Sequence, residues 1–171
     1  MPSESRAAPP SKIVPERIAF AISLGLFVVA LAAPALHLQS VNGYSDFDYT
    51  GLDCLAFGWA ALGRHPAWLG NLFFAVALIF EWRKKPLVAG IFALASLGFA
   101  FSTFQLADQG RAFFDPSSHN QTVASFGVAV YLWIASQLTI VVAAAIELVL
   151  RARARRTHGR HSQPATLGRS S

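Results

Sequence analysis

Long apolar blocks separated by short polar segments dominate the sequence. Residues 18–36 and residues 87–104 contain no charged side chain, and residues 123–150 contain only one, Glu147. A transmembrane helix needs about 20 mostly apolar residues to cross a hydrocarbon core roughly 30 Å thick. The pattern therefore predicts membrane spans at about 18–36, 87–104 and 123–150. Glu147 and Arg151, four residues apart, are expected to form an ion pair at the end of the last helix.

The apolar segment from residue 51 to residue 83 is interrupted by Arg64, His65 and Pro66. A single helix across it would place Arg64 near the membrane centre, where an arginine costs about 2.5–3.5 kcal/mol. Pro66 would also remove a helix hydrogen bond. We therefore predict an interfacial helix at about 52–62 on the outer face, followed by a span at about 66–83 with proline in its first turn. The predicted fold class is all-α, a bundle of four transmembrane helices with this additional interfacial helix.

The first span has an alternative interpretation as a cleaved signal peptide, because Ala33-Pro34-Ala35 has the small-x-small form of a cleavage site. Three features favour a retained helix. The uncharged run is longer than the usual apolar part of a signal peptide, a tail of residues 1–17 precedes it, and proline occupies the middle of the candidate site. We therefore expect this helix to remain in the protein.

The placement of basic residues predicts how the chain is threaded. The chain is 54% hydrophobic and 13% charged, with a net charge of +5. Apart from Arg64 and Arg111, every Lys and Arg lies in the N-terminal tail 1–17, the turn 83–85 or the C-terminal tail 151–171. Basic flanks stay in the cytoplasm, so both termini of this multi-pass chain are expected there. The tail 151–171 is expected to be disordered and close to anionic lipid, with no nucleic-acid partner.

The acidic segment YSDFDYTGLD is the first candidate site. Asp46 and Asp48, followed by Thr50 and Gly51, match the first half of a calcium-binding EF-hand loop, but Phe57 stands where the pattern requires a bidentate glutamate. Asp46, Asp48 and Asp53 are therefore a candidate site for a loosely held cation, with His37 nearby. The interpretation that we favour is an acidic outer loop whose aromatic residues lie at the membrane interface.

Five residues are predicted to pack helices together. Gly51, Cys54 and Gly58 recur at helical spacing and form a stripe of small residues that permits close approach. Asn71 and Gln137 are polar residues inside spans, where a hydrogen bond to a neighbouring helix is the usual role. No acid, base and nucleophile converge in the sequence, so neither enzymatic activity nor a cofactor is expected.

Three separated motifs carry a resemblance to a known group of proteins. They are Gly51 with Cys54-Leu55 and Gly58-Trp59, then Trp68-Leu69 with Asn71, then Tyr131-Leu132-Trp133. In this form and order the chain resembles a group of small bacterial inner-membrane proteins with the pattern GxxCLxxGW, WLxN and YLW. The resemblance implies a four-helix protein of the bacterial inner membrane and carries no known activity.

Two functional hypotheses follow. The first is an integral membrane protein that acts by lateral association with a partner membrane protein, or with a second copy, through the small-residue stripe at 51–62. The alternative is a small ligand- or cation-binding membrane protein that uses the acidic outer residues Asp46, Asp48 and Asp53.

Overall fold

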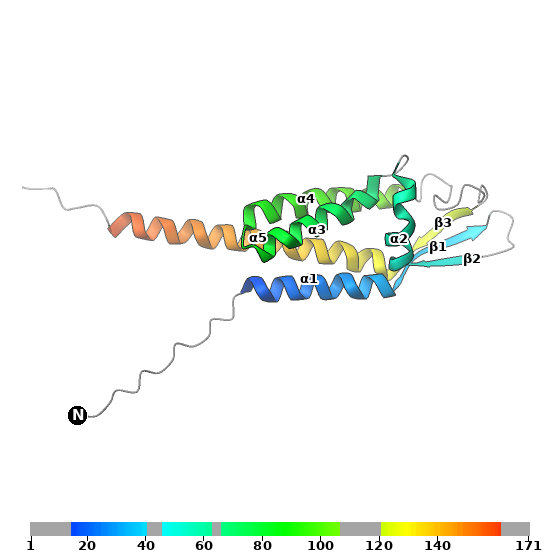
Figure 1. Ribbon diagram of the computed structural model, residues 1–171, viewed down its shortest axis with the longest axis horizontal. Coiled ribbons are helices and arrows are strands. Elements are labelled where there is room, and N and C mark those ends of the chain that lie inside the picture. Colours follow the sequence, from blue (N-terminus) through cyan, green and yellow to red (C-terminus); the bar gives the residue numbers. More distant parts are fainter. Residues whose placement is uncertain (1–14, 41–45, 63–65, 107–120, 162–171) are drawn as a thin grey trace, which may run out of the picture.

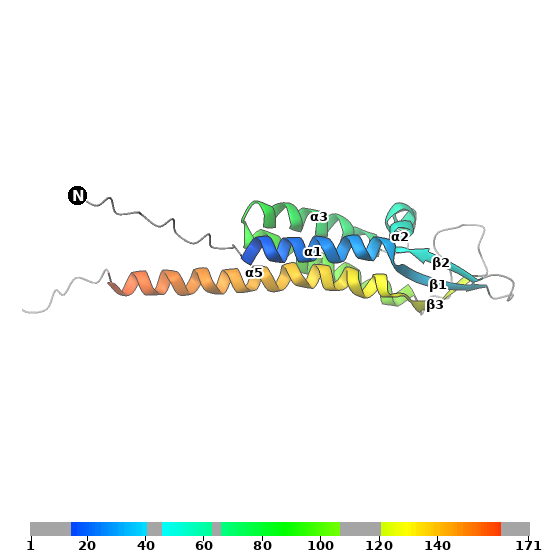
Figure 2. The same ribbon diagram turned by 90° about the horizontal axis from the view of Figure 1, so that it is seen from below.

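A computed structural model describes residues 15–40, 46–62, 66–106 and 121–161, and within these ranges the chain is mostly helical. Long helices lie side by side, and a small sheet and a short helix gather at one end (Figures 1 and 2). We call this the sheet end. The long helices are α1 (Pro15–Ala32), α3 (Leu69–Trp82), α4 (Pro86–Phe101) and α5 (Val128–His161).

The long helices form a ring with one loose seam. α1 packs along α5, α5 along α4, and α4 along α3, whereas α1 and α3 make few direct contacts. α3 and α4 are antiparallel because only a short turn joins them, and in that turn Lys84 adopts a φ of 57°. Two pairs of aromatic side chains bridge the seam between α1 and α3. The ring centroids of Phe27 and Phe74 lie 5.3 Å apart, and those of Phe20 and Trp82 lie 5.4 Å apart.

Small and polar side chains, together with the larger Phe74 and Ile140, fill the interior of the ring. Ala77, Ala89 and Ala93 are completely buried where the helices meet. Buried serine hydroxyls are paired with backbone carbonyls across helices: Ser23 donates to Ser136 O at 2.8 Å, and Ser96 donates to Gly70 O at 2.7 Å. Large aliphatic and aromatic side chains of all these helices point outward and are exposed, among them Ile22, Val28, Val29, Leu72, Ile79, Ile91, Leu94, Phe101, Leu138 and Val142.

A small antiparallel sheet is the main departure from the predicted fold. Within the described residues its strands are β1 (Pro34–Ser40), β2 (Asp46–Thr50) and β3 (Gln121–Phe126), in the order β2-β1-β3. The all-α prediction therefore missed a sheet where loops and span ends were expected. β1 alternates in polarity: Leu36 and Leu38 are buried, while His37 and Gln39, which follow them in turn, are less covered. Such alternation is the period of a half-buried strand.

The sheet shortens two of the predicted spans. α1 ends at Ala32 instead of residue 36, because Pro34 begins β1. α5 begins at Val128 instead of residue 123, because residues up to Phe126 belong to β3. Within the described residues, two helices are long and apolar enough to cross a membrane, Pro86–Leu106 with 21 residues and Val128–Arg156 with 29. Arg17–Ala32 and Pro66–Trp82 are shorter apolar helices.

The remaining helical segments lie close to their predicted bounds. The expected helix at 52–62 corresponds to α2 (Gly51–Phe57) continued by the 3-10 turn η1 (Gly58–Ala61), and the next helix begins with η2 (Pro66–Trp68). A third 3-10 segment, η3 (Ser102–Leu106), extends α4. Arg64 and His65, on which the predicted split depends, lie outside the described residues.

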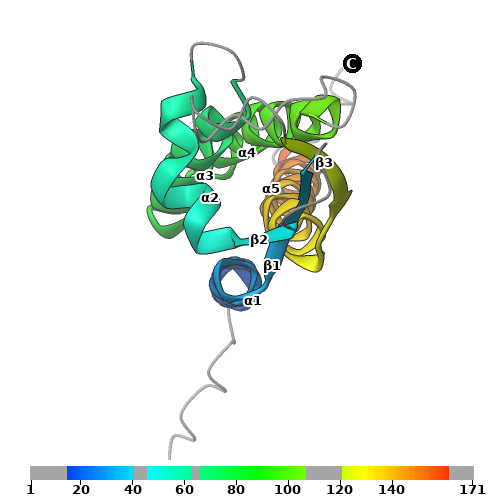
Figure 3. The same ribbon diagram turned by 90° about the vertical axis from the view of Figure 1, so that its right-hand side faces the viewer.

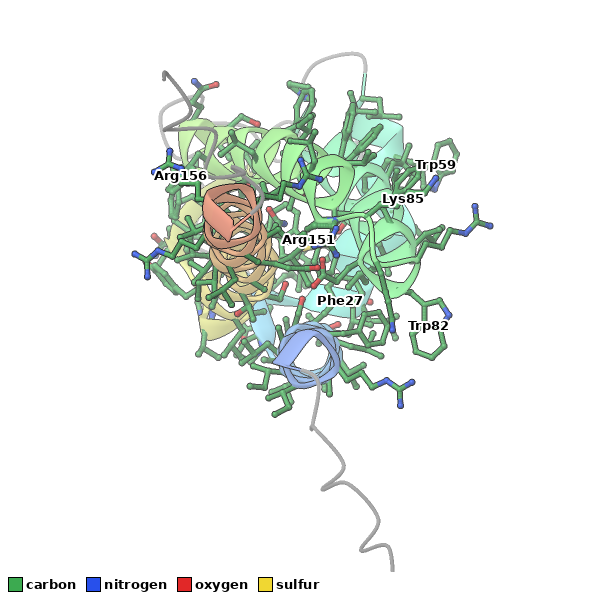
Figure 4. The ribbon with its side chains drawn as sticks, turned by 90° about the vertical axis from the view of Figure 1, so that its left-hand side faces the viewer. Phe27, Trp59, Trp82, Lys85, Arg151 and Arg156 are labelled. Atoms are coloured by element: carbon green, nitrogen blue, oxygen red, sulfur yellow. The ribbon has the colours of Figure 1, made fainter. Side chains whose placement is uncertain are left out.

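α5 continues far beyond the other helices, to His161 (Figures 1 and 2). The first part of the tail 151–171, predicted to be disordered, is therefore helical, because the arginine-rich run continues an established helix without a breaker. The expected ion pair between Glu147 and Arg151 is present, and Arg151 also donates to Lys84 O in the α3–α4 turn at 3.4 Å. Figure 4 shows Arg151 directed toward the interior and Arg156 directed away from it. Residues 1–14 and 162–171 lie outside the described residues.

Candidate functional site

A partly open cavity of about 110 Å³ lies near the sheet end, lined by residues of α1, β1, α2, α3, α5 and the 3-10 segments beside them. Seen from that end, α1, α2, α4 and α5 surround the centre of the molecule (Figure 3). The lining is mostly apolar. The aromatic, thiol and polar side chains among the lining residues are those of Phe27, Cys54, Trp68, Asn71, Thr103 and Trp133.

The short helix α2 is fixed in place at its first turn. Thr50 caps it, because its hydroxyl oxygen accepts a hydrogen bond from Asp53 N at 3.3 Å, while the Asp53 carboxylate accepts from Thr50 N at 2.9 Å and from the Thr50 hydroxyl at 2.6 Å. These bonds favour the ionised carboxylate and lower the pKa of Asp53. This reciprocal arrangement is a capping box.

Glycine at the first position of α2 allows the helix to rest on α1. Gly51 N donates to Ala33 O at 3.0 Å. A Cβ atom at Gly51 would lie 2.1 Å from Ala30 O, far inside van der Waals contact. Directly after α1, the first residues of β1 are approached by Gly127, whose N donates to Ala35 O at 2.8 Å and whose added Cβ would lie 2.2 Å from Pro34 O.

The end of α2 is held by Trp68 at the start of the third helix. The indole Nε1 of Trp68 donates to Leu55 O at 2.9 Å. A Cβ at Gly58 would lie 2.7 Å from the Trp68 ring. Gly51 and Gly58 therefore face α1 and Trp68 of the same chain, and Cys54 between them lines the cavity.

Cys54 has the properties of a packing residue. It is half-buried, and no disulfide partner exists because it is the only cysteine. Burial, together with the neighbouring Asp53 charge, raises the pKa of its thiol to about 12. A nucleophilic cysteine requires a lowered pKa, because the thiolate is the reactive form. The thiol therefore stays protonated at neutral pH.

Two residues that line the cavity each carry a fully buried polar atom that has no hydrogen-bond partner among the described residues. These atoms are the Thr103 hydroxyl oxygen, on a residue only 8% exposed, and the indole Nε1 of Trp133. Gln137, one turn further along α5, is completely buried, and neither atom of its amide has a described partner. We predicted that Gln137 forms a hydrogen bond to a neighbouring helix, and among the described residues its amide forms no such bond. Asn71 is half-buried and lines the cavity.

The three candidate cation ligands take different positions. Asp48 Oδ1 lies 2.5 Å from His37 Nδ1, across the β1–β2 pair. Asp53 caps α2, and Asp46 pairs with Gln39 in the backbone register, while its side chain lies outside the described residues. No group of three His, Cys, Asp or Glu suited to a metal occurs in the described parts of the chain. Cation binding at these aspartates stays a prediction.

Sequence reasoning singled out several residues of the cavity without predicting the cavity itself. Gly51, Cys54, Gly58, Trp68, Asn71 and Trp133, which carried the resemblance, all line it. Thr103 was missed, since a lone threonine near a helix end gives no signal of an unpaired hydroxyl. No family model matches the chain, and no curated protein or solved structure matches it either.

Proposed function

We propose that this chain is an integral membrane protein with four spans and both termini on the cytoplasmic side of a bacterial inner membrane. The observation that carries this proposal is the distribution of side chains across the bundle. Ser23, Ser96, Ser136 and Gln137 are completely buried, whereas large aliphatic side chains on every long helix are exposed. A soluble protein has the opposite arrangement. In lipid, an apolar surface is favourable, and small or polar residues bring the helices together.

The lengths of the two shorter helices are compatible with spanning. α1 has 18 residues, which corresponds to about 27 Å at 1.5 Å per residue. The third helix, from Pro66 to Trp82, corresponds to about 25 Å. Both values are slightly below the roughly 30 Å of a hydrocarbon core, and local thinning of the bilayer or extended flanking side chains offset such a mismatch.

Charge and tryptophan placement support the orientation. Arg17, Lys84 and Arg151 lie at the end of the bundle opposite the sheet, which the positive-inside rule assigns to the cytoplasm. Trp82 is 72% exposed near that end and Trp59 is 58% exposed near the sheet end, and both point away from the bundle (Figure 4). Exposed indoles at both ends suit the two headgroup regions of a bilayer.

Within the membrane, we assign the protein a non-enzymatic role in association with a second membrane helix. The stripe of Gly51, Cys54 and Gly58 is occupied by its own chain, so it is not the surface for this contact. A groove of about 590 Å³ between α1 and α5, to whose lining Glu81 of α3 also contributes, is the better candidate. Its α5 wall carries Ala135, Thr139 and Ala143 at intervals of four, the small-xxx-small spacing that lets helix backbones approach. The Thr139 hydroxyl donates to Ala135 O at 2.8 Å, so no polar group is left unpaired on this wall.

Reporter fusions test the topology. A periplasm-active reporter fused after Arg156 should be silent, and the same reporter inserted near Ser118 should be active. The reverse pattern would overturn the orientation.

Cysteine crosslinking in native membranes tests the association surface. Val142→Cys places a thiol in the groove, and Ile91→Cys places one on the exposed face of α4 as a control. The two positions lie at similar depth, because Gly90 and Ala144 are in contact range. The native Cys54 gives little background, since its thiol is protonated and half-buried. We expect crosslinked products from Val142→Cys well above those from Ile91→Cys, and equal or absent products from both would refute the groove as an interface.

A further inference from the structure

We propose that the cytoplasmic end of the seam between α1 and α3 binds the headgroup of an anionic phospholipid, whose acyl chains follow the exposed helix faces into the bilayer. A pocket of about 540 Å³ lies there, within the roughly 300–1,000 Å³ range of ligand sites. We call it the headgroup pocket, and its lining residues are Arg17, Phe20, Ala21, Glu81, Trp82 and Lys84. Its placement at the cytoplasmic leaflet rests on the proposed function, whereas its charge and size do not.

Two cationic side chains line the headgroup pocket. Arg17 near the start of α1 and Lys84 in the α3–α4 turn are both exposed, and neither forms an ion pair within the described parts of the chain. Both groups are hydrogen-bond donors only, and a phosphate diester supplies negatively charged acceptor oxygens. The carboxylate oxygens of Glu81 are buried, so they do not face the open space of the pocket. The accessible charge of the lining is therefore positive.

Lys84 is held in a conformation that a lysine rarely adopts. Its φ of 57° lies in the left-handed region. The turn is a Schellman motif, in which Lys84 N donates to Glu81 O at 2.9 Å and Lys85 N donates to Phe80 O at 3.0 Å. Glycine is the usual residue at this position because it has no Cβ. Residues kept in such costly conformations cluster at ligand sites, so we assign the ammonium group of Lys84 to the lipid headgroup.

Aromatic and aliphatic side chains continue the headgroup pocket toward the bilayer. The ring centroids of Phe20 and Trp82 lie 5.4 Å apart across the seam, and Trp82 is 72% exposed. Figure 4, viewed from the end opposite the sheet, shows Trp82 at the edge of the bundle and directed outward. One helical turn deeper, Leu24 of α1 and Ile79 of α3 are also exposed. An indole at headgroup depth above exposed apolar side chains suits a lipid, which brings acyl chains as well as a phosphate, better than a free phosphate ion.

Native mass spectrometry of the delipidated full chain in detergent tests this site. The chain is titrated with phosphatidylglycerol, with zwitterionic phosphatidylcholine and with glycerophosphoglycerol, the soluble headgroup without acyl chains. We expect phosphatidylglycerol to bind more tightly than the other two. Equal binding of the two lipids would overturn the proposal, and equal binding of the soluble headgroup would exclude a lipid as the occupant. Binding in detergent does not depend on how the chain is threaded, so its failure is distinguishable from failure of the reporter test of topology.

Neutral variants with a matched control test the two cations. Arg17→Gln and Lys84→Gln each remove one charge from the headgroup pocket, whereas Lys85→Gln removes the same charge from a neighbouring exposed residue that does not line it. Each groove charge should contribute about 5-fold to the affinity for phosphatidylglycerol, so the first two variants should lose about that factor and Lys85→Gln should bind nearly as the unchanged chain does. Equal losses in all three variants would show that the lipid is held by the overall basic charge, and would refute the site.

Lys84→Gly separates a role in lipid binding from a role in the fold. Glycine accepts the left-handed conformation without strain, so the melting temperature of this variant in lipid-free detergent should be at least that of the unchanged chain. Added phosphatidylglycerol should raise it by less than it raises that of the unchanged chain. A lower melting temperature without lipid, together with full stabilisation by phosphatidylglycerol, would show that Lys84 serves the turn and would contradict its assignment to the headgroup.

Discussion

Replacing Gly51 by alanine should detach α2 from α1. The added Cβ would lie 2.1 Å from Ala30 O, 2.9 Å from Ala30 C and 3.0 Å from Leu31 Cα. All three atoms belong to the backbone of a helix, so none can rotate away. The hydrogen bond from Gly51 N to Ala33 O, at 3.0 Å, would also be lost when the helices separate.

The expected cost is large compared with the net stability of a protein. Overpacking that side chains can absorb costs about 1–3 kcal/mol, and a backbone hydrogen bond contributes about 1 kcal/mol. We therefore expect Gly51→Ala to lower the free energy of unfolding by roughly 2–4 kcal/mol, out of a typical total of about 5–15 kcal/mol. Gly25→Ala and Gly98→Ala are matched controls, because no atom lies within 4 Å of the added Cβ at either position. In these helices alanine should stabilise by about 0.5–1 kcal/mol.

Thermal and denaturant unfolding of the detergent-solubilised variants measures these changes, and Trp68 fluorescence reports on α2 directly because its indole bonds Leu55 O. If Gly51→Ala is as stable as Gly25→Ala, then α2 does not rest on α1. If Gly51→Ala keeps its stability but loses crosslinking between copies, the small-residue stripe serves association, as its spacing alone suggested.

Three further predictions concern single polar groups. Thr50→Ala should lower the free energy of unfolding by about 1 kcal/mol at neutral pH. Because folding lowers the pKa of Asp53, its ionised carboxylate stabilises the fold above pH 3.8, and this stabilisation is lost as the pH falls through the folded pKa. Thermal melts at acid pH should therefore show a smaller difference in stability between Thr50→Ala and the unchanged chain. Mass spectrometry should show that folded Cys54 resists modification by N-ethylmaleimide at pH 8. The protonated Cys54 thiol contributes fully to the stability of the fold below pH 9.0, and this contribution should disappear as the pH rises toward about 12. Gln137→Met should raise the free energy of unfolding by about 1–3 kcal/mol, and a decrease would reveal a bound partner for the amide.

The helices were predictable because their signals are local. Pro66 and Pro86 begin helical segments, as expected of a residue that fits the first turn of a helix. The ends at Trp82 and Phe101 lie within a few residues of the predicted bounds. Pro66 predicted the start of a new helical segment, and η2 begins there, whereas Arg64, the other basis of the predicted split, lies outside the described residues.

The sheet was not predicted, although its residues carry a strand signal. Asp46 to Tyr49 alternate strictly between acidic and aromatic residues, and Leu36 to Gln39 alternate between leucine and polar residues. When hydropathy is averaged over the length of a membrane span, Leu36 is assigned to the preceding apolar helix, and the two-residue alternation of the strand is no longer visible. The pairing also joins β1 to β3 across a long stretch of chain, and such long-range pairing has no local signature.

The cavity could be predicted only in part. Helical spacing identified Gly51, Cys54 and Gly58 as one face, because that pattern depends on sequence alone. Which surface the face contacts depends on how α2 is turned against α1. The unpaired state of Thr103 and Trp133 depends on where every neighbouring acceptor lies, and these neighbours come from helices far apart in the sequence.

α1 borders both the groove and the cavity. One side of it forms the groove with α5, and the other side faces the seam with α3 and the cavity. At the sheet end, Gly51 rests on the last turn of α1 and Gly127 bonds Ala35 of β1 directly after it, whereas at the opposite end the aromatic contact Phe20–Trp82 joins α1 to α3. A partner helix in the groove would therefore shift α1 most easily about its fixed sheet end, and that motion changes the width of the seam.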